Sequence, residues 1–304
     1  ITLIIGFIWI LWALKPFLSE IPRPSLTLFK DNIRYGIKAY LASFFSFMVL
    51  RVDLLMIKYM IGAKYAGYYS IAVAICNILF TLPVVVGMIL FSKLSAPESW
   101  NDRWSLTCKS AYAVGIIMFL ACLGILFLGK YVIGFLYGNV FLPAYTPLSI
   151  MSFGVFIWSI ESIFRKLLNT DPIKGFRIEV VYIWGFILPV NILLNYILIP
   201  YYGIPGAAIA TTLSFFINLS VSAYIAKRIV HVRYDITWFS KAIVLTIVII
   251  TFFYICSVFL NDYLAGTISL AVYLGLIYYY LLTKEEHTYL IGTIKTFSSK
   301  IYGK

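Results

Sequence analysis

Long apolar runs separated by short polar segments dominate the sequence. After an apolar stretch over residues 1–14, eight longer runs follow, at 39–61, 69–92, 110–129, 142–164, 179–199, 204–226, 240–260 and 263–282. An α-helix needs about 20 apolar residues to cross the hydrocarbon core of a bilayer. The pattern therefore predicts an all-α, polytopic transmembrane bundle with about eight full spans and one partial span.

The polar segments divide the chain into parts. As a helix, residues 1–14 would cover only about 21 Å, and the chain begins at Ile1 without the basic segment that precedes a signal peptide's apolar region. We therefore expect a partial transmembrane helix at 1–14 and a chain that lacks an N-terminal part. Residues 15–39 are predicted to be a basic cytoplasmic linker, 40–282 the helical bundle and 283–304 a basic cytoplasmic tail, which is either a short amphipathic surface helix or a frayed end.

Composition and charge placement agree with a membrane protein. The chain is 62% hydrophobic and only 12% charged, whereas soluble domains are about 45–50% apolar and about 25% charged. Of the 24 Lys and Arg residues, 20 fall in alternate polar segments on one side of the predicted membrane. The positive-inside rule makes that side, with the C-terminus, cytoplasmic. The net charge of +12 therefore reflects the orientation of the spans in the membrane and does not indicate a nucleic-acid partner.

Catalytic and metal-binding patterns are not found in the sequence. The four cysteines form no CxxC pair, and the two histidines lie far apart without ligand spacing to acidic or cysteine residues. No Ser/His/Asp set and no glycine-rich phosphate loop is present. We therefore expect neither an enzyme nor a resident cofactor or metal.

Two charges, Arg51 and Asp53, lie well inside the span at 39–61. Such residues usually face a bundle interior or a wet cavity. On a helix at 100° per residue, Phe44, Phe47, Arg51 and Lys58 share one narrow face, and Asp53 points about 200° away from Arg51. Rings and cations on one face suit an anionic, sugar-bearing ligand in a cavity. The alternative is that Arg51 extends along the helix toward the membrane surface.

Two further pairs of polar residues lie in other spans. Glu161 and Arg165 have the i, i+4 spacing of a helical ion pair, either a salt bridge at the membrane boundary or an ion-coupling site. Asn191 and Asn195 share a helix face, where they either line the lumen or hydrogen-bond a neighbouring helix. We keep all four as candidate site residues.

Three segments resemble a known family. Residues 191–214 (NILLNYILIPYYGIPGAAIATTLS) are similar to a signature of bacterial polysaccharide biosynthesis exporters. Residues 34–70, with an Arg-x-Asp in the helix, and the run IPRPSLTLFKDNIRYGIKAYLASF at 21–44 resemble the same family. These proteins are the O-antigen and capsule flippases of the multidrug/oligosaccharidyl-lipid/polysaccharide (MOP) exporter superfamily.

The resemblance implies 12 or 14 helices in two lobes around a central cavity, a fold shared with MATE transporters. The present spans would then be the end of the first lobe and the second lobe. It also implies translocation of undecaprenyl-diphosphate-linked oligosaccharide repeat units of a surface polysaccharide, such as the O-antigen of lipopolysaccharide, from the cytoplasmic to the outer leaflet by alternating access.

On this interpretation Arg51 and Lys58 would bind the diphosphate or acidic sugars, Phe44 and Phe47 the glycan, and Asp53 or Glu161 would couple transport to a proton or sodium gradient. The expected location is the bacterial inner membrane. Expected partners are the lipid-linked oligosaccharide, the bilayer, and a polysaccharide polymerase with its chain-length machinery.

The sequence leaves rival functions open. A small-molecule or drug exporter of the same fold is the alternative, although a cation exporter should carry acidic charge where this span carries Arg51. A glycan polymerase or ligase would need a sizeable outer loop, and the predicted outer loops are short. A scaffold without transport leaves the deep Arg51 unexplained.

Overall fold

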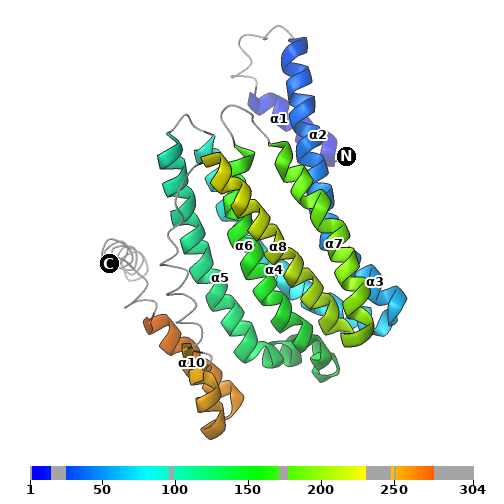
Figure 1. Cartoon of the computed structure of the whole chain (residues 1–304), viewed down its shortest axis with the longest axis vertical. Coiled ribbons are helices and arrows are strands. Elements are labelled where there is room, and N and C mark those ends of the chain that lie inside the picture. The colour runs from blue at the N-terminus through cyan, green and yellow to red at the C-terminus, as the bar shows by residue number, and fades with distance from the viewer. Residues whose placement is uncertain are drawn as a thin grey trace.

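The computed structural model describes residues 2–14, 25–95, 99–170, 177–230, 248–249 and 251–276. Every regular element in these ranges is a helix, and the long helices run side by side (Figure 1). Residues 248–249 and 251–259 are also helical. The labelled helices are α1 (Thr2–Leu14), α2 (Leu26–Val49), α3 (Val52–Met60), α4 (Ala63–Leu94), α5 (Trp100–Tyr137), the 3₁₀ helix η2 (Asn139–Ala144), α6 (Tyr145–Asn169), α7 (Ile178–Tyr202), α8 (Ile204–Val230) and α10 (Asp262–Leu276).

The predicted all-α membrane bundle is confirmed. Six helical segments are long and apolar enough to span a membrane: Leu26–Met60, Ala63–Leu94, Trp100–Tyr137, Asn139–Asn169, Ile178–Tyr202 and Ile204–Ala226. They correspond to the first six predicted full spans. Part of the predicted span 240–260, the end of 263–282, residues 15–24 and the tail 283–304 lie outside the described residues.

The helices extend further than the apolar runs. The α2 helix begins at Leu26, so residues 26–39, predicted as linker, are helical. Ser25 caps this helix, because its hydroxyl accepts a hydrogen bond from the backbone N–H of Leu28 at 3.3 Å. Ser99 caps α5 in the same way through Asp102 N–H at 3.2 Å. The polar ends belong to the same helices as the apolar centres, so hydropathy alone underestimates helix length.

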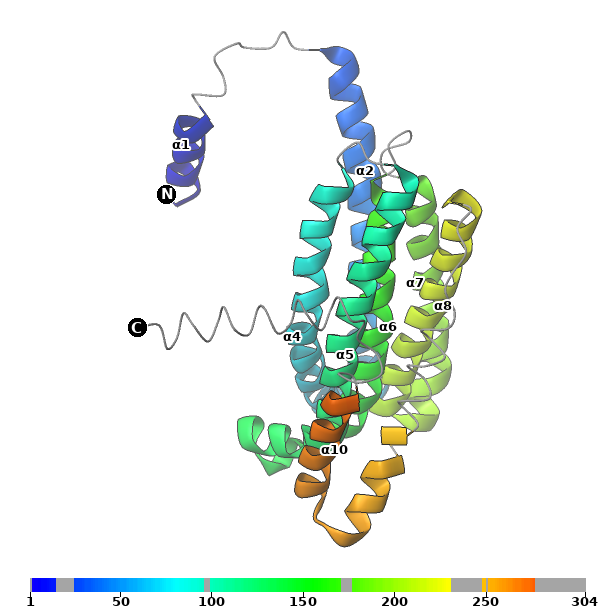
Figure 2. The ribbon, with the colours of Figure 1, turned by 90° about the vertical axis from the view of Figure 1, so that its left-hand side faces the viewer.

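The two ends of the bundle differ in their connections. The turns after α3, α5 and α7 each contain a glycine with positive φ: Gly62 (111°), Gly138 (89°) and Gly203 (62°). A positive φ is accessible to glycine at little steric cost. Because these helices alternate in direction, all three turns lie at one end, here called the glycine end. The other end, at the top of Figure 2, is here called the basic end, since the basic residues next to the intervening connections lie there.

Helix α6 occupies the centre of the bundle and packs against α4, α5 and α8. Its contact with α8 is close: a Cβ at Gly154 would come within 2.8 Å of the Thr212 hydroxyl oxygen. Gly206 of α8 lies directly against the Leu198 carbonyl of α7. Small residues allow this close approach, which brings the polar side chains of α6, α7 and α8 within reach of one another.

Candidate functional site

The first spanning segment is interrupted between α2 and α3. The N–H of Arg51 bonds to the Met48 carbonyl at 3.1 Å, a tighter turn than an α-helix, and Arg51 itself has φ −127°. Two residues later, the Asp53 carboxylate accepts the Leu54 N–H at 2.7 Å. A side chain inserted into the backbone ladder is a recognised cause of a helix kink. The break therefore has a local cause, although the segment contains neither proline nor glycine there.

Asp53 lies in the interior of the bundle and is only 1% exposed. Its Oδ2 accepts hydrogen bonds from the Tyr69 hydroxyl of α4 at 2.6 Å and from the Thr211 hydroxyl of α8 at 3.2 Å. Asp53 also sits in the first turn of α3, where free N–H groups favour a negative charge. No ion pair to Asp53 occurs among the described residues, so hydroxyl and backbone donors satisfy it.

The cluster continues onto α7. The Asn191 amide nitrogen lies 3.1 Å from the Ser214 hydroxyl and 3.5 Å from the Thr211 hydroxyl, and both partners belong to α8. Asn195, one turn further along α7, donates to the Asn191 side-chain oxygen at 3.1 Å. Both asparagines are fully buried. Of the two interpretations, lining the lumen or hydrogen-bonding a neighbouring helix, the bonds of Asn191 to α8 correspond to the second. Asp53, Tyr69, Thr211, Asn191, Asn195 and Ser214 are here called the polar cluster.

Arg51 has the opposite environment. It is exposed, and its guanidinium carbon lies 5.6 Å from the centre of the Phe47 ring. Phe47 and Phe44 are about half exposed, and Phe44 stacks on Tyr40 with 6.4 Å between ring centres. Tyr40, Phe44, Phe47 and Arg51 are here called the aromatic strip.

One geometric expectation is wrong. The break at Arg51 interrupts the 100° progression, so the single face proposed for Phe44, Phe47, Arg51 and Lys58 does not run through one continuous helix. Lys58 lies on α3 beside Tyr59, with its nitrogen 6.0 Å from the ring centre. The structure thus places Arg51 beside Phe47 and leaves Lys58 with a different aromatic partner.

A second buried charge cluster lies toward the basic end. Glu161 of α6 is fully buried, and its two oxygens lie 3.2 Å from Arg165 Nε. The Ser222 hydroxyl of α8 donates to Glu161 at 3.3 Å. The Arg165 guanidinium also lies near the rings of Trp158 and Trp184, at 5.9 and 5.6 Å. The expected i, i+4 pair is therefore present, with a buried carboxylate where the sequence suggested the membrane boundary.

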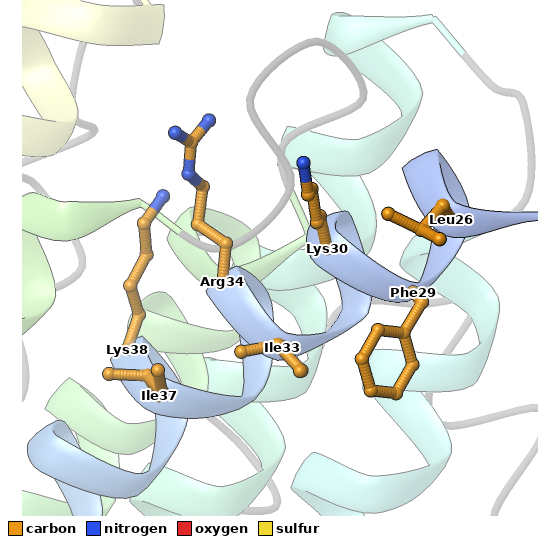
Figure 3. A pocket seen from close by; sticks show the side chains of 7 residues that line it. All are labelled: Leu26, Phe29, Lys30, Ile33, Arg34, Ile37 and Lys38. Atoms are coloured by element: carbon orange, nitrogen blue, oxygen red, sulfur yellow. The ribbon is translucent and has the colours of Figure 1, made fainter.

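A shallow groove of about 560 Å³ runs along one side of α2 near the basic end. Figure 3 shows Lys30, Arg34 and Lys38 extending to one side of the helix, with Ile33 and Phe29 beside them. A basic stripe beside an apolar stripe suits contact with anionic lipid headgroups. This groove lies apart from the polar cluster and contributes no residue to it.

Several site residues were missed by sequence reasoning. Tyr69 is an ordinary residue in an apolar run, and no spacing signal marks it. Thr211, Ser214 and Ser222 recur at helical spacing on one face, and that periodicity could have identified them. Among the described residues, no group of three or more His, Cys, Asp or Glu could hold a metal ion. The polar cluster offers neutral hydrogen-bonding groups around a single carboxylate.

Comparison with known proteins gives a consistent result. A sequence profile for the family described as "Polysaccharide biosynthesis protein" matches residues 2–145. The chain is 24% identical over 229 residues to the probable low-salt glycan biosynthesis flippase Agl15 of Haloferax volcanii, covering 74% of this chain and 48% of that protein. It is also 24% identical over 287 residues to an uncharacterized membrane protein of Methanocaldococcus jannaschii, covering 91% and 54%. The chain thus spans about half the length of these relatives.

The fold is similar to that of the lipid II flippase MurJ in an inward closed conformation. The TM-score is 0.67 with 17% sequence identity, covering 89% of this chain and 59% of that chain. The predicted resemblance to polysaccharide biosynthesis proteins is therefore confirmed by the matching profile, and the fold agrees with it. One of the two sequence relatives is described as a probable flippase, and the structural neighbour is described as a flippase.

Proposed function

We propose, from the resemblance to polysaccharide biosynthesis flippases, that this chain forms part of a flippase for a lipid-linked glycan. In finer detail, the substrate is an undecaprenyl-diphosphate-linked repeat unit of a surface polysaccharide. It moves from the cytoplasmic to the outer leaflet by alternating access. The basic end faces the cytoplasm, following the positive-inside rule.

The aromatic strip is the observation that carries this proposal. An exposed guanidinium within a membrane span is expensive unless it meets a polar group, and Arg51 has no ion pair among the described residues. A diphosphate presents oxygens that a guanidinium can bind in a forked geometry. The exposed rings of Phe44 and Phe47 suit the apolar faces of sugars. We assign Arg51 to the diphosphate and the two phenylalanines to the glycan.

The buried carboxylates have a different proposed role. Asp53 and Glu161 are enclosed by the bundle, so neither is placed to bind a bulky glycan. We assign them to coupling with a proton or sodium gradient. Buried ionisable residues in membrane spans commonly serve such pathways.

The test uses the complete product of the gene in a strain that lacks its own flippase. Surface polysaccharide and accumulated lipid-linked repeat units are measured for the wild type and for Arg51→Ala, at equal membrane abundance. Arg228→Ala is the matched control, because Arg228 is also exposed and lies 5.8 Å from the Tyr224 ring centre. We expect the wild type and the control to restore polysaccharide and Arg51→Ala to fail.

Two other outcomes change the proposal. Restoration by Arg51→Ala would keep the function and remove Arg51 from the substrate path. No restoration by the wild type, with the matching glycan genes supplied, would favour the small-molecule exporter.

A further inference from the structure

One face of α8 is polar along its buried length. Thr211, Ser214, Asn218 and Ser222 are each no more than 2% exposed. At 100° per residue they fall within about 80° of arc. Ser220 lies on the opposite face and is exposed. A polar face of this length is unusual on a buried helix of a membrane bundle, and it is here called the α8 stripe.

The α8 stripe joins the two buried carboxylates. Near the glycine end, Thr211 donates to Asp53 at 3.2 Å. Toward the basic end, Ser222 donates to Glu161 at 3.3 Å. Asp53 and Glu161 are on different helices and have no other shared feature. The stripe spans the 11 residues between its two terminal hydroxyls, or about 16 Å of helix.

The middle of the α8 stripe is unsatisfied. Asn218 is fully buried, and neither its amide nitrogen nor its amide oxygen has a hydrogen-bond partner among the described residues. An unpaired buried amide is costly, and water commonly satisfies such groups. Asn218 lies about 6 Å along the helix from Ser214 and from Ser222. That separation matches two hydrogen bonds through one water molecule.

We propose that the α8 stripe is a proton path between Asp53 and Glu161, hydrated at Asn218; this rests on the gradient coupling in the proposed function. Each hydroxyl or water takes one proton and gives up another, so no charge accumulates along the path. Ser214 donates to the Ala210 carbonyl at 2.8 Å, so its hydroxyl turns from that carbonyl toward the path when it passes a proton on. The Asn191 amide, which donates to Thr211 and Ser214, only holds the two hydroxyls in place. Asn218 holds and orients water and carries no proton itself. Asp53 and Glu161 exchange protons at the two ends.

The groups at the two ends suit this role. Asp53 meets the Tyr69 hydroxyl from α4 and the Thr211 hydroxyl from α8, and Arg51 precedes it by two residues on its own segment. Glu161 meets Arg165 of its own helix, and the Arg165 side chain is 18% exposed. Arg165 therefore connects the buried carboxylate with the basic end.

The test reconstitutes the complete protein in liposomes that contain a pH-sensitive dye and imposes a proton gradient. Asn218→Leu removes the central amide at similar volume, whereas Asn218→Ser keeps a polar group and room for water. Ser220→Leu places the same leucine on the opposite face of α8. We expect proton uptake to fall by about tenfold or more in Asn218→Leu, a barrier increase of about 1.4 kcal/mol, and to persist in the other two.

A structural role for Asn218 predicts a different pattern. If Asn218→Leu folds and conducts protons like the wild type, the proposal is overturned. If Asn218→Leu does not fold, Ser222→Ala takes its place, with the same expected loss and the same overturning result. Equal loss of uptake in Asn218→Ser and Asn218→Leu, with both folded, would also overturn it.

Movement of a lipid-linked glycan is measured separately in the same liposomes. Glycan movement without stripe-dependent proton uptake would overturn the path and leave the flippase standing. Proton uptake that depends on Asn218, without glycan movement, would keep the path and remove the proposed substrate. Glycan movement that depends on sodium and ignores the proton gradient would also overturn the path.

Discussion

Arg51 and Asp53 are two residues apart, yet they belong to regions with opposite chemistry. Arg51 is exposed on the aromatic strip, where it has one ring beside it. Asp53 is enclosed in the polar cluster, where it accepts three hydrogen bonds. The break between α2 and α3 makes this possible, because it starts a new helix whose first turn points inward. A kinked segment can therefore place neighbouring residues in two different environments, one exposed and one buried.

The largest effect on the contrast between the two regions is expected from Asp53→Leu. It leaves the Tyr69 and Thr211 hydroxyls and the Leu54 N–H without their acceptor in the bundle interior. Since each such group costs about 1–3 kcal/mol, we expect the free energy of unfolding to fall by about 3 kcal/mol or more. Chemical unfolding of the purified complete protein in detergent measures this. Asp53→Asn keeps an acceptor oxygen and should lose clearly less; equal losses would contradict the hydrogen-bond account.

A smaller effect is expected from Tyr69→Phe. This change removes one hydroxyl donor to Asp53 and keeps the ring. Interhelical hydrogen bonds in membranes are worth about 1–2 kcal/mol at most, so the loss in unfolding free energy should lie in that range. Tyr65→Phe, on the same helix but about half exposed, should change little. If both variants lose the same amount, the hydroxyl of Tyr69 has no special role.

The smallest effect is expected from Arg51→Ala. An exposed cation–π contact is worth about 0.5–1 kcal/mol, so stability should fall by no more than that. The control is Arg103→Ala, because Arg103 also lies over a ring, that of Trp100, yet is 1% exposed and donates to Thr170. Its loss should be larger, about 2 kcal/mol. A large loss for Arg51→Ala would mean that the aromatic strip is structural.

The spans could be predicted because backbone N–H and C=O groups in the hydrocarbon core of a bilayer must form hydrogen bonds within the chain, as they do in a helix. The first residues of the helices could not be predicted from hydropathy, since the capping residues Ser25 and Ser99 lie outside the apolar runs. The i, i+4 spacing predicted the ion pair of Glu161 with Arg165. The burial of Glu161 could not be predicted in this way, because it involves the packing of α8 against α6.

The partners of Asp53 could not be predicted from the sequence. Tyr69 is 16 residues away and Thr211 is 158 residues away, and only the packing of three helices, α3, α4 and α8, brings them together. The break at Arg51 escaped prediction because neither proline nor glycine marks it. The side chain of Asp53 competes with the backbone, which a helical projection does not consider.

The turn at Gly203 also has a mechanical consequence. Helices α7 and α8 are separated by this single residue, and the Gly206 N–H closes the turn on the Gly203 carbonyl at 3.1 Å. If the two helices rotated about this turn as lever arms of roughly 37 Å, a rotation of about 10° would displace their far ends by about 6 Å. Asn191 lies about 18 Å along its arm, so the same rotation would move it by about 3 Å, enough to break its hydrogen bonds to α8. The Asn191 bonds therefore hold the two arms together.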